Sequence, residues 1–288
     1  MSYAQSKLLR IGIFLKEGLV YMIFRIILLA LCAGGILTPE AHAQLFLENA
    51  KVSLSVSGGE RINGSLLIHN TSSVVMSMRV YWEDFEYKSP YDGTKNFLPA
   101  GTAPRSASQW VAFKPQVFTI PAFGQQSVDY TVSVPSQIEE GHYGVLFFER
   151  TPSPSENPHE ITIVTRVGSL FFIEPSIKNK KAVIQDIGLQ GNSIIASFVN
   201  QGNITLIPHT TYYIMQNDGM VLYRGDSKNL YVPAGATAKI EIPLKKKLSQ
   251  GHYTVVLNSD LDEGDVVVKE IGLVVDASGQ LSIESSKD

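Results

Sequence analysis

The tripeptide Gly-His-Tyr occurs twice in this chain, at 141–143 and at 251–253, and each copy leads into an apolar stretch. The matched pair His142 and His252 could form one divided catalytic or metal site. The same repetition could equally mark one structural corner that is built twice. The surrounding sequence decides between these interpretations, because a duplicated corner requires a duplicated module around it.

Hydrophobic residues alternate with polar ones through much of the chain. Val52, Leu54 and Val56, for example, alternate with serines, which is the period-2 pattern of a β-strand with one buried face. Clusters of Gly, Asn, Ser and Pro separate such segments, as is typical of turns between strands. No apolar stripe with helical spacing follows Gln44. We therefore predict an all-β fold.

The repetition extends well beyond the tripeptide. The segment GSLLIHNTSS (64–73) corresponds to NSIIASFVNQGN (192–203), and IPAFGQQSVDYTVSVP (120–135) corresponds to VPAGATAKIEIP (232–243). The second pair precedes its Gly-His-Tyr copies by 21 and 19 residues, whereas the first pair, counted from Asn70 and Asn200, precedes them by 71 and 51. The first copy is longer, and we assign the difference to an insertion near residues 86–109. The chain is thus predicted to contain two copies of one β module.

The predicted modules are two tandem immunoglobulin-like β-sandwich domains behind an N-terminal signal peptide. They span residues 44–175 and 176–276, and 277–288 form a polar C-terminal tail. Each module is long enough to enclose its own core.

The tripeptide fits a corner of such a sandwich. A glycine permits the sharp turn, and a tyrosine two residues later packs inward with its hydroxyl bonded back to the loop. We therefore expect Tyr143 and Tyr253 in the two cores. Because neighbouring strand residues point to opposite faces, His142 and His252 should face outward. The tripeptide is interpreted as scaffold rather than as a site.

The N-terminus has the features of an export signal. An arginine precedes the apolar run 26–37, and Ala41-His42-Ala43 offers the small-x-small pattern that signal peptidase cuts, so residues 1–43 are predicted to be a signal peptide. Met22 is the natural start of such a peptide, and we interpret residues 1–21 as an upstream start-site artefact. The expected location is periplasmic or extracellular.

Composition excludes several classes of function. The single cysteine, Cys32, lies in the predicted signal peptide, which leaves no disulfide and no thiolate metal site in the exported chain. A net charge of −3 with scattered charges argues against nucleic-acid binding. No second apolar stretch is long enough to span a membrane. No nucleophile–base motif or phosphate loop occurs, so we expect no catalytic residues, no cofactor and no metal, and a protein that is not an enzyme.

One acidic stretch has two readings. The segment 259–268, SDLDEGDVVV, gathers four carboxylates, and such oxygen clusters can hold calcium. Its glycine comes one place too early for an EF-hand loop, however, and this mismatch favours an acidic hairpin turn.

Taken together, these motifs resemble the PapD-like periplasmic pilus-assembly chaperones. The resemblance covers most of the exported chain and is carried by WVAFKPQVFTIPAFGQQSVDYTV (110–132), GHYGVLFFERTP (141–152) and ITIVTRVGSLFFIEP (161–175). The layout is also similar to the two-module surface proteins associated with WxL cell-wall proteins. Both resemblances imply two immunoglobulin-like domains and a role outside the cytoplasm.

The resemblance to the chaperones implies a mode of partner binding. Family members use the last strand of the first domain as an edge that completes the sheet of a pilus subunit, and a basic pair near the domain cleft holds the subunit's terminal carboxylate. Arg166 matches the basic residue of that strand, whereas Lys51 is out of register with the other. The client is expected to be an extracytoplasmic protein, either a pilin-like subunit or a surface protein. The predicted partner-binding residues are Ile161, Ile163, Thr165, Arg166 and Val167.

Two segments of the first module are apolar on both faces, namely 143–148 and 167–173. A sandwich strand normally shows one face to water, so both segments need cover on two sides. The insertion or the second domain could supply that cover. Alternatively, a protein partner docks along the 161–173 edge. Arg166 then either guards this edge against aggregation or contacts an acidic group of the partner.

These observations support three hypotheses in descending order. The first is an exported, non-enzymatic protein that acts like a chaperone in the assembly of a pilus or another surface structure. The second is a wall-associated or surface module that binds polymer or another surface protein. The third is a hydrolase that uses the insertion around Trp82 and Trp110 together with the acidic hairpin, and it ranks last because no nucleophile or acid–base pair is visible.

Overall fold

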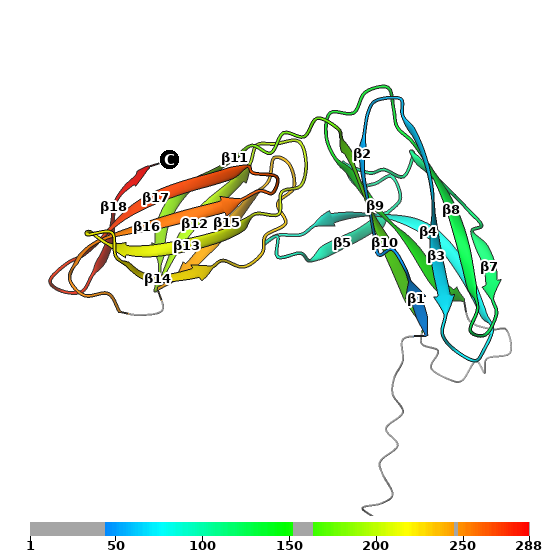
Figure 1. The fold of residues 1–288 in the computed structure, drawn as a ribbon, viewed down its shortest axis with the longest axis horizontal. Coiled ribbons are helices and arrows are strands. Elements are labelled where there is room, and N and C mark those ends of the chain that lie inside the picture. Colours follow the sequence, from blue (N-terminus) through cyan, green and yellow to red (C-terminus); the bar gives the residue numbers. More distant parts are fainter. Residues whose placement is uncertain (1–43, 152–163, 245–246, 288) are drawn as a thin grey trace, which may run out of the picture. The chain divides into compact units, whose positions relative to one another are not determined.

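In the computed structural model, residues 44–151, 164–244 and 247–287 are described. Every regular element in these ranges is a β-strand, and no helix occurs in them. The strands form two tandem immunoglobulin-like β-sandwiches, each built from two sheets packed face to face (Figure 1). The prediction of an all-β fold with two such domains is confirmed. The predicted signal peptide lies outside the described residues.

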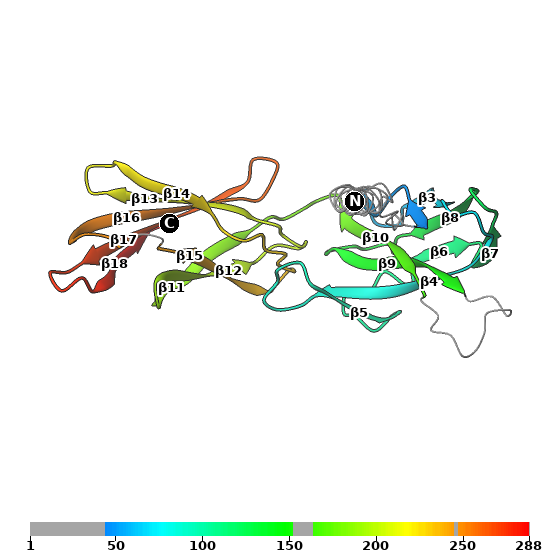
Figure 2. The same cartoon turned by 90° about the horizontal axis from the view of Figure 1, so that it is seen from below.

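The first sandwich consists of a four-stranded and a six-stranded sheet. The four-stranded sheet has the order β1 (Leu45–Leu47), β3 (Arg61–Asn70), β8 (Gln125–Ser133) and β6 (Val111–Lys114). The six-stranded sheet has the order β2 (Lys51–Val56), β10 (Arg166–Pro175), β9 (His142–Thr151), β4 (Met76–Tyr87) and β5 (Lys95–Pro99), with β7 (Val117–Ile120) also paired to β4. The N-terminal part of this sandwich therefore crosses from one sheet to the other between β1 and β2. Along the opposite side of the larger sheet, β5 runs beside β4 (Figure 2).

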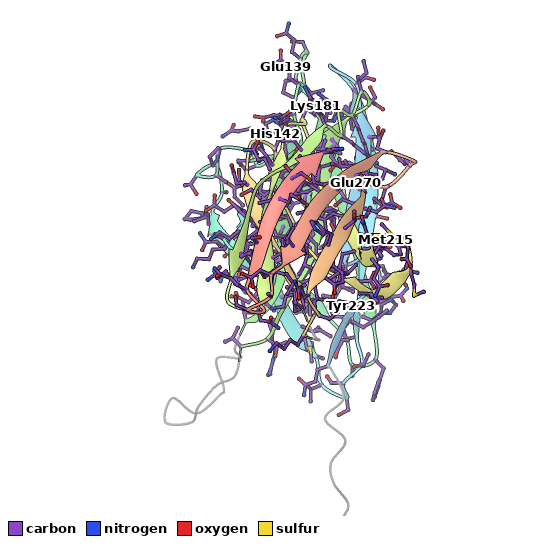
Figure 3. All side chains as sticks on the ribbon, turned by 90° about the vertical axis from the view of Figure 1, so that its left-hand side faces the viewer. Glu139, His142, Lys181, Met215, Tyr223 and Glu270 are labelled. Atoms are coloured by element: carbon purple, nitrogen blue, oxygen red, sulfur yellow. The ribbon has the colours of Figure 1, made fainter. Side chains whose placement is uncertain are left out.

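The second sandwich consists of a three-stranded and a five-stranded sheet. The smaller sheet has the order β11 (Ala182–Gln190), β12 (Ser193–Asn200) and β15 (Thr237–Pro243). The larger sheet has the order β14 (Val221–Asp226), β13 (His209–Gln216), β16 (Gly251–Asp260), β17 (Val266–Val275) and β18 (Leu281–Lys287). Figure 3 shows its side chains, with Met215 on β13, Tyr223 on β14 and Glu270 on β17.

Each sandwich has its own core, because alternate residues of facing strands point inward. In the first, Leu66, Met78 and Phe148 are among the fully buried residues. In the second, Phe198 and Ile214 are among the fully buried residues.

The two copies use one buried asparagine in the same way. The side-chain amide of Asn70 donates to the carbonyl oxygens of Val74 and Ile120, at 2.6 and 3.3 Å. The amide of Asn200 likewise donates to the carbonyl four residues later and to that of Val232, both at 2.8 Å. A buried amide requires such partners, so both copies hold two loops together through the same bonds. The alignment predicted from the sequence is thus matched at this position, where Asn70 makes one further bond, to the Pro121 carbonyl oxygen at 2.9 Å.

The polar segment 277–288 contains a strand rather than only a tail. Residues 281–287 form β18, which pairs with β17, and Leu281 and Ile283 pack against the second core. Their spacing of two residues directs both side chains to the same face. The second sandwich therefore extends beyond residue 276, the boundary predicted from the sequence. Across the described ranges, no helix has the length and apolar character needed to cross a membrane.

Candidate functional site

The edge of β10 changes character along its length. On one side, β10 pairs with β9 from Arg166 to Ile173. On the other side, β2 pairs with β10 only from Leu170 onward, where the Leu170 nitrogen lies 2.9 Å from the carbonyl oxygen of Ala50. Among the described residues, 166–169 therefore have a strand partner on the β9 side alone. We call residues 166–169 the open edge.

The direction of the main-chain groups on the open edge follows from the strand geometry. The Leu170 nitrogen faces β2, and the groups of every second residue point the same way. The N–H and C=O groups of Arg166 and Gly168 are therefore directed toward the open side. An unpaired row of this kind is a template for the addition of another strand.

Of the five predicted partner-binding residues, Arg166 and Val167 begin β10 and Thr165 directly precedes it. Thr165 is exposed, and its carbonyl oxygen accepts a hydrogen bond from the Arg150 nitrogen at 3.0 Å. Val167 is half-buried and packs against the main core. Ile161 and Ile163 lie outside the described residues. The edge is shorter than the predicted 161–173, because β2 covers β10 from Leu170 onward.

The side chain of Arg166 contacts residues of its own sheet. Its guanidinium donates to the Tyr81 hydroxyl and to a Glu83 carboxylate oxygen, each at 3.1 Å. The same group lies 4.0 Å from the ring centre of Phe147 and 5.7 Å from that of Phe97. The hydrogen bond with Tyr81 raises the pKa of Arg166. A partner's acidic group would have to compete with Glu83, so this geometry favours the guard interpretation of Arg166.

The basic pair implied by the resemblance is not assembled by Arg166 and Lys51. Arg166 is the first residue of β10, and the link to the second sandwich follows Pro175, the last one. Nine strand steps separate the two, roughly 30 Å. The ammonium of Lys51 instead lies over the Phe172 ring, 4.6 Å from its centre. Arg166 and Lys51 therefore do not form a basic pair beside the link between the domains.

The apolar outer face of the large sheet is covered from within the chain. A second hydrophobic cluster, which we call the outer cluster, lies on this face. It is separate from the core between the two sheets, the main core of this sandwich. The buried members of the outer cluster are Phe85, Tyr87, Tyr143, Val145, Phe147 and Phe172. Phe97 of β5, within the insertion, packs edge-on against Phe147 with ring centres 5.2 Å apart. Of the two explanations offered for these doubly apolar strands, internal cover by the insertion is the one that the contacts support.

A buried carboxylate orders the insertion. Asp84 is 0% exposed and accepts hydrogen bonds from the Trp82 indole, the Thr102 and Ala103 nitrogens and the Ser106 hydroxyl, at distances between 2.6 and 3.1 Å. Four donors around one carboxylate offset the loss of water that burial of a charge entails. The segment after β5 is thus fixed to the sheet by a residue that sequence reasoning did not single out.

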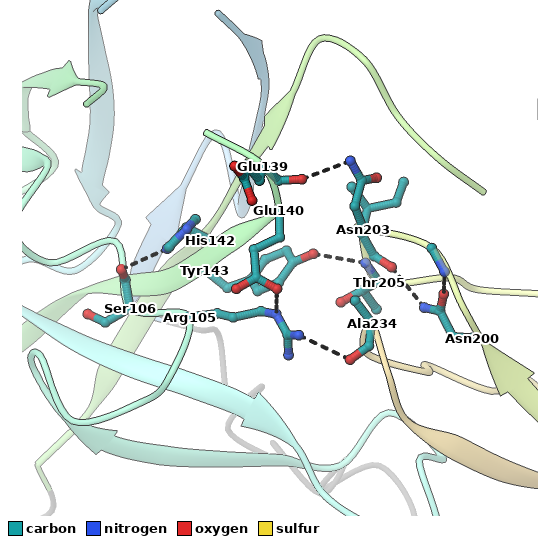
Figure 4. A network of polar contacts seen from close by, with 12 residues as sticks. Arg105, Ser106, Glu139, Glu140, His142, Tyr143, Asn200, Asn203, Thr205 and Ala234 are labelled. Carbon is teal, nitrogen blue, oxygen red and sulfur yellow. Dashed lines mark hydrogen bonds and ion pairs between the residues drawn. The ribbon is translucent and has the colours of Figure 1, made fainter. Parts of the chain in front are cut away.

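The two Gly-His-Tyr copies differ in the face on which the tyrosine lies. Tyr253 packs in the second core, and its hydroxyl donates to the carbonyl oxygen of Ser249 at 2.8 Å, as predicted. Tyr143 belongs to the outer cluster instead, and its hydroxyl accepts a hydrogen bond from the Thr205 nitrogen at 2.9 Å (Figure 4). Burial raises the pKa of Tyr143 to about 12. The predicted bond to its own loop was therefore wrong for the first copy.

The two histidines, His142 and His252, also differ in the face on which they lie. His142 is half-buried, with its ring centre 4.1 Å from that of Trp110 and its Nδ1 atom 3.1 Å from the Ser106 carbonyl oxygen. Burial lowers the pKa of His142. His252 is exposed and lies 3.3 Å from Glu284. The prediction of an outward histidine is right for His252 and wrong for His142.

The residues around Tyr143 join the two sandwiches. Asn203 donates from its side chain to the carbonyl oxygens of Glu139 and Ile177, at 2.9 and 3.1 Å. Arg105, in the insertion, pairs with Glu140 at 2.8 Å and donates to the Ala234 carbonyl oxygen at 3.1 Å (Figure 4). Sequence reasoning missed this group, because each residue is isolated in the sequence and only the fold brings them together.

The acidic segment 259–268 forms a hairpin turn. Asp262 and Glu263 adopt positive φ angles, 67° and 59°, and the Lys180 ammonium bonds to Glu263 and to the Asp262 carbonyl oxygen, at 2.9 and 3.2 Å. The turn is thus neutralised in part by a lysine of the segment between the sandwiches. No group of three or more His, Cys, Asp or Glu side chains suited to a metal ion occurs in the described part of the chain.

The fold is similar to that of solved fimbrial chaperone structures. No protein-family model and no curated protein matches the chain. Among solved structures, the class 5 fimbriae chaperone CfaA matches 84% of this chain and 100% of its own, with 13% identity and a TM-score of 0.51. A chain of the chaperone–tip adhesin complex of CFA/I fimbriae biogenesis matches over 78% and 97%, with 13% identity and a TM-score of 0.50. The predicted resemblance to the PapD-like architecture is confirmed at the level of the fold.

Proposed function

We propose that this protein is an exported, non-enzymatic, chaperone-like factor in the assembly of a pilus or another surface structure. It binds an extended segment of an extracytoplasmic client, a pilin-like subunit or a surface protein, along the start of β10. The client segment adds to the large sheet of the first sandwich as a further strand. Its main chain bonds to Arg166 and Gly168, and the side chains of Ile161, Ile163 and Thr165 supply specificity.

The observation that carries the proposal is the unequal cover of β10. The half nearest the second sandwich is paired on both sides, whereas residues 166–169 have their second side free of any described strand. If β10 had no partner outside the chain, a β2 strand that paired with its whole length would be favourable, because unpaired edges promote aggregation. The likeness of the fold to chaperone structures agrees with this use of the edge.

The experiment replaces the two predicted apolar contacts with charges. In the Ile161→Asp/Ile163→Asp variant we expect client capture to fall at least tenfold, since two buried apolar contacts are worth roughly 3 kcal/mol or more. Ile177→Asp is the matched control, because Ile177 is 84% exposed and lies outside β10. Circular dichroism should show all three proteins folded. Unchanged co-purification of the client with the double variant would reject the edge as the binding site.

The wild type and the double variant also separate the two leading hypotheses. Pull-down from envelope extract, followed by analysis of both protein and polymer, distinguishes a chaperone from a wall-associated module. Specific retention of glycan polymer that survives the double substitution would favour the wall-associated function.

A further inference from the structure

The insertion contacts the second sandwich as well as its own sheet. The carbonyl oxygen of Tyr91 accepts a hydrogen bond from the Tyr231 nitrogen at 2.8 Å. The rings of Tyr87 and Tyr231 are stacked with centres 5.0 Å apart and an angle of 26° between their planes. Arg105 adds its bond to the Ala234 carbonyl oxygen. Three independent contacts thus connect the insertion to one loop, residues 231–236, of the second sandwich.

The insertion is itself a rigid support. Its β5 strand pairs with β4 over five residues, and its later part is held by the four donors around Asp84. Tyr87 is buried, and burial raises its pKa. Gly93 approaches the Tyr231 ring so closely that a Cβ atom there would lie 2.9 Å from it. The contacts to loop 231–236 therefore arise from an ordered surface.

A second attachment changes the mechanics of a two-domain chain. The covalent link, residues 176–181, and the Asn203 bonds beside it form one attachment between the sandwiches. Domains that are joined at a single place move relative to one another by default. An additional attachment, through a different loop, prevents one sandwich from rotating about the first attachment.

We propose that the insertion is a brace that locks the two sandwiches into one rigid body. Loop 231–236 is its receptor, and Tyr231 is the central contact. The brace does not depend on the identity of any client, so it stands or falls separately from the proposed function. It gives the additional residues of the first copy a mechanical role besides covering the outer cluster.

The test is the rotational diffusion of each sandwich, measured by backbone nitrogen NMR relaxation on the full chain. In the wild type, amides of both sandwiches should report the same correlation time. In Tyr231→Ala and in Tyr231→Ala/Arg105→Ala, the second sandwich should tumble with a correlation time shorter by about twofold, since each domain is about half of the body. Tyr231→Phe keeps the stacked ring and should behave as the wild type.

Each alternative result has a clear meaning. Separate tumbling in the wild type would overturn the brace, and so would unchanged joint tumbling in both alanine variants. Dispersed amide signals from both sandwiches verify that every variant is folded, and the single substitution in an external loop provides a measurement even where the double variant fails to fold.

Discussion

The Tyr143 hydroxyl lies 2.9 Å from the Thr205 backbone nitrogen and accepts its hydrogen bond. Both residues are buried, with 6% and 8% of their surface exposed. The bond exists because Tyr143 faces the outer cluster rather than the main core of its sandwich. In the second copy, Tyr253 faces the core and closes its own corner. One tripeptide therefore serves as a corner in one module and as a link between modules in the other.

Removal of the Tyr143 hydroxyl should weaken the protein measurably. In Tyr143→Phe the ring remains in place, but the buried Thr205 N–H loses its acceptor, and we expect a loss of about 1–3 kcal/mol in the free energy of unfolding. Tyr253→Phe is the comparison, because its partner Ser249 is exposed and can bond to water, so the loss there should be about 1 kcal/mol or less. Urea denaturation measures both. Equal stability of Tyr143→Phe and wild type would contradict the structural role of this bond.

Substitution of Asp84 should have the largest effect among the polar residues discussed. Asp84→Ala leaves four donors without their acceptor, and we expect a loss of roughly 3 kcal/mol or more. Asp92→Ala, at an exposed turn of the same insertion, should change stability by about 0.5 kcal/mol. Guanidinium denaturation of the two variants provides the comparison. A loss below 1 kcal/mol for Asp84→Ala would show that the insertion is not organised by this carboxylate.

Gly144 should not tolerate a side chain. A Cβ atom there would lie 1.9 Å from Trp82, so Gly144→Ala should destabilise the first sandwich by about 1–3 kcal/mol through overpacking. At Gly188 a Cβ atom would meet nothing within 4 Å, and Gly188→Ala should be neutral. Thermal unfolding followed by circular dichroism checks the pair. A neutral Gly144→Ala would mean that Trp82 does not pack against this strand as described.

His142 should make stability depend on pH. Burial lowers its pKa in the folded state, so the unfolded chain binds a proton more readily. The stability contribution is therefore full above the unfolded pKa of about 6.5 and is lost as the pH falls through the folded value. Urea unfolding between pH 8 and 4 should show a steeper acid loss for wild type than for His142→Gln. The exposed His252→Gln is the control, and identical pH profiles of wild type and His142→Gln would refute the assignment.

Arg166 should act as a guard rather than as a contact for the client. Arg166→Ala removes a charge from the open edge, and we expect greater self-association with retained client capture. Arg79→Ala removes a cation from β4 of the same sheet, where Arg79 pairs with Glu149 at 2.5 Å, and should leave association unchanged. Analytical ultracentrifugation and co-purification measure the two properties. Loss of capture in Arg166→Ala without any change in association would restore the acidic-contact interpretation.

Sequence periodicity was sufficient for the fold, because strands that bury one face carry their pattern locally. The correspondence of Asn70 with Asn200 could also be read from the sequence, since a buried amide occupies the same place in both copies. The resemblance to the chaperones pointed to the correct architecture for the same reason.

The face of a strand on which a side chain lies, and contacts between residues far apart in the sequence, were harder to predict. A shift of one residue in the strand moves a side chain to the opposite face, which is why Tyr143 and His142 were placed wrongly while Tyr253 was placed correctly. Asp84 and Arg105 gave no local signal, because their partners lie elsewhere in the chain. The strand β18 was missed because only Leu281 and Ile283 mark its buried side.

The most direct test of the proposed client edge is amide hydrogen exchange, read by mass spectrometry, on the protein purified alone and in complex with its client. Binding should slow amide exchange at Arg166 and Gly168, while the amides of Leu170–Glu174, where β2 already pairs with β10, change little. Unchanged exchange at Arg166 and Gly168, with protection appearing on another surface, would contradict the proposed client edge.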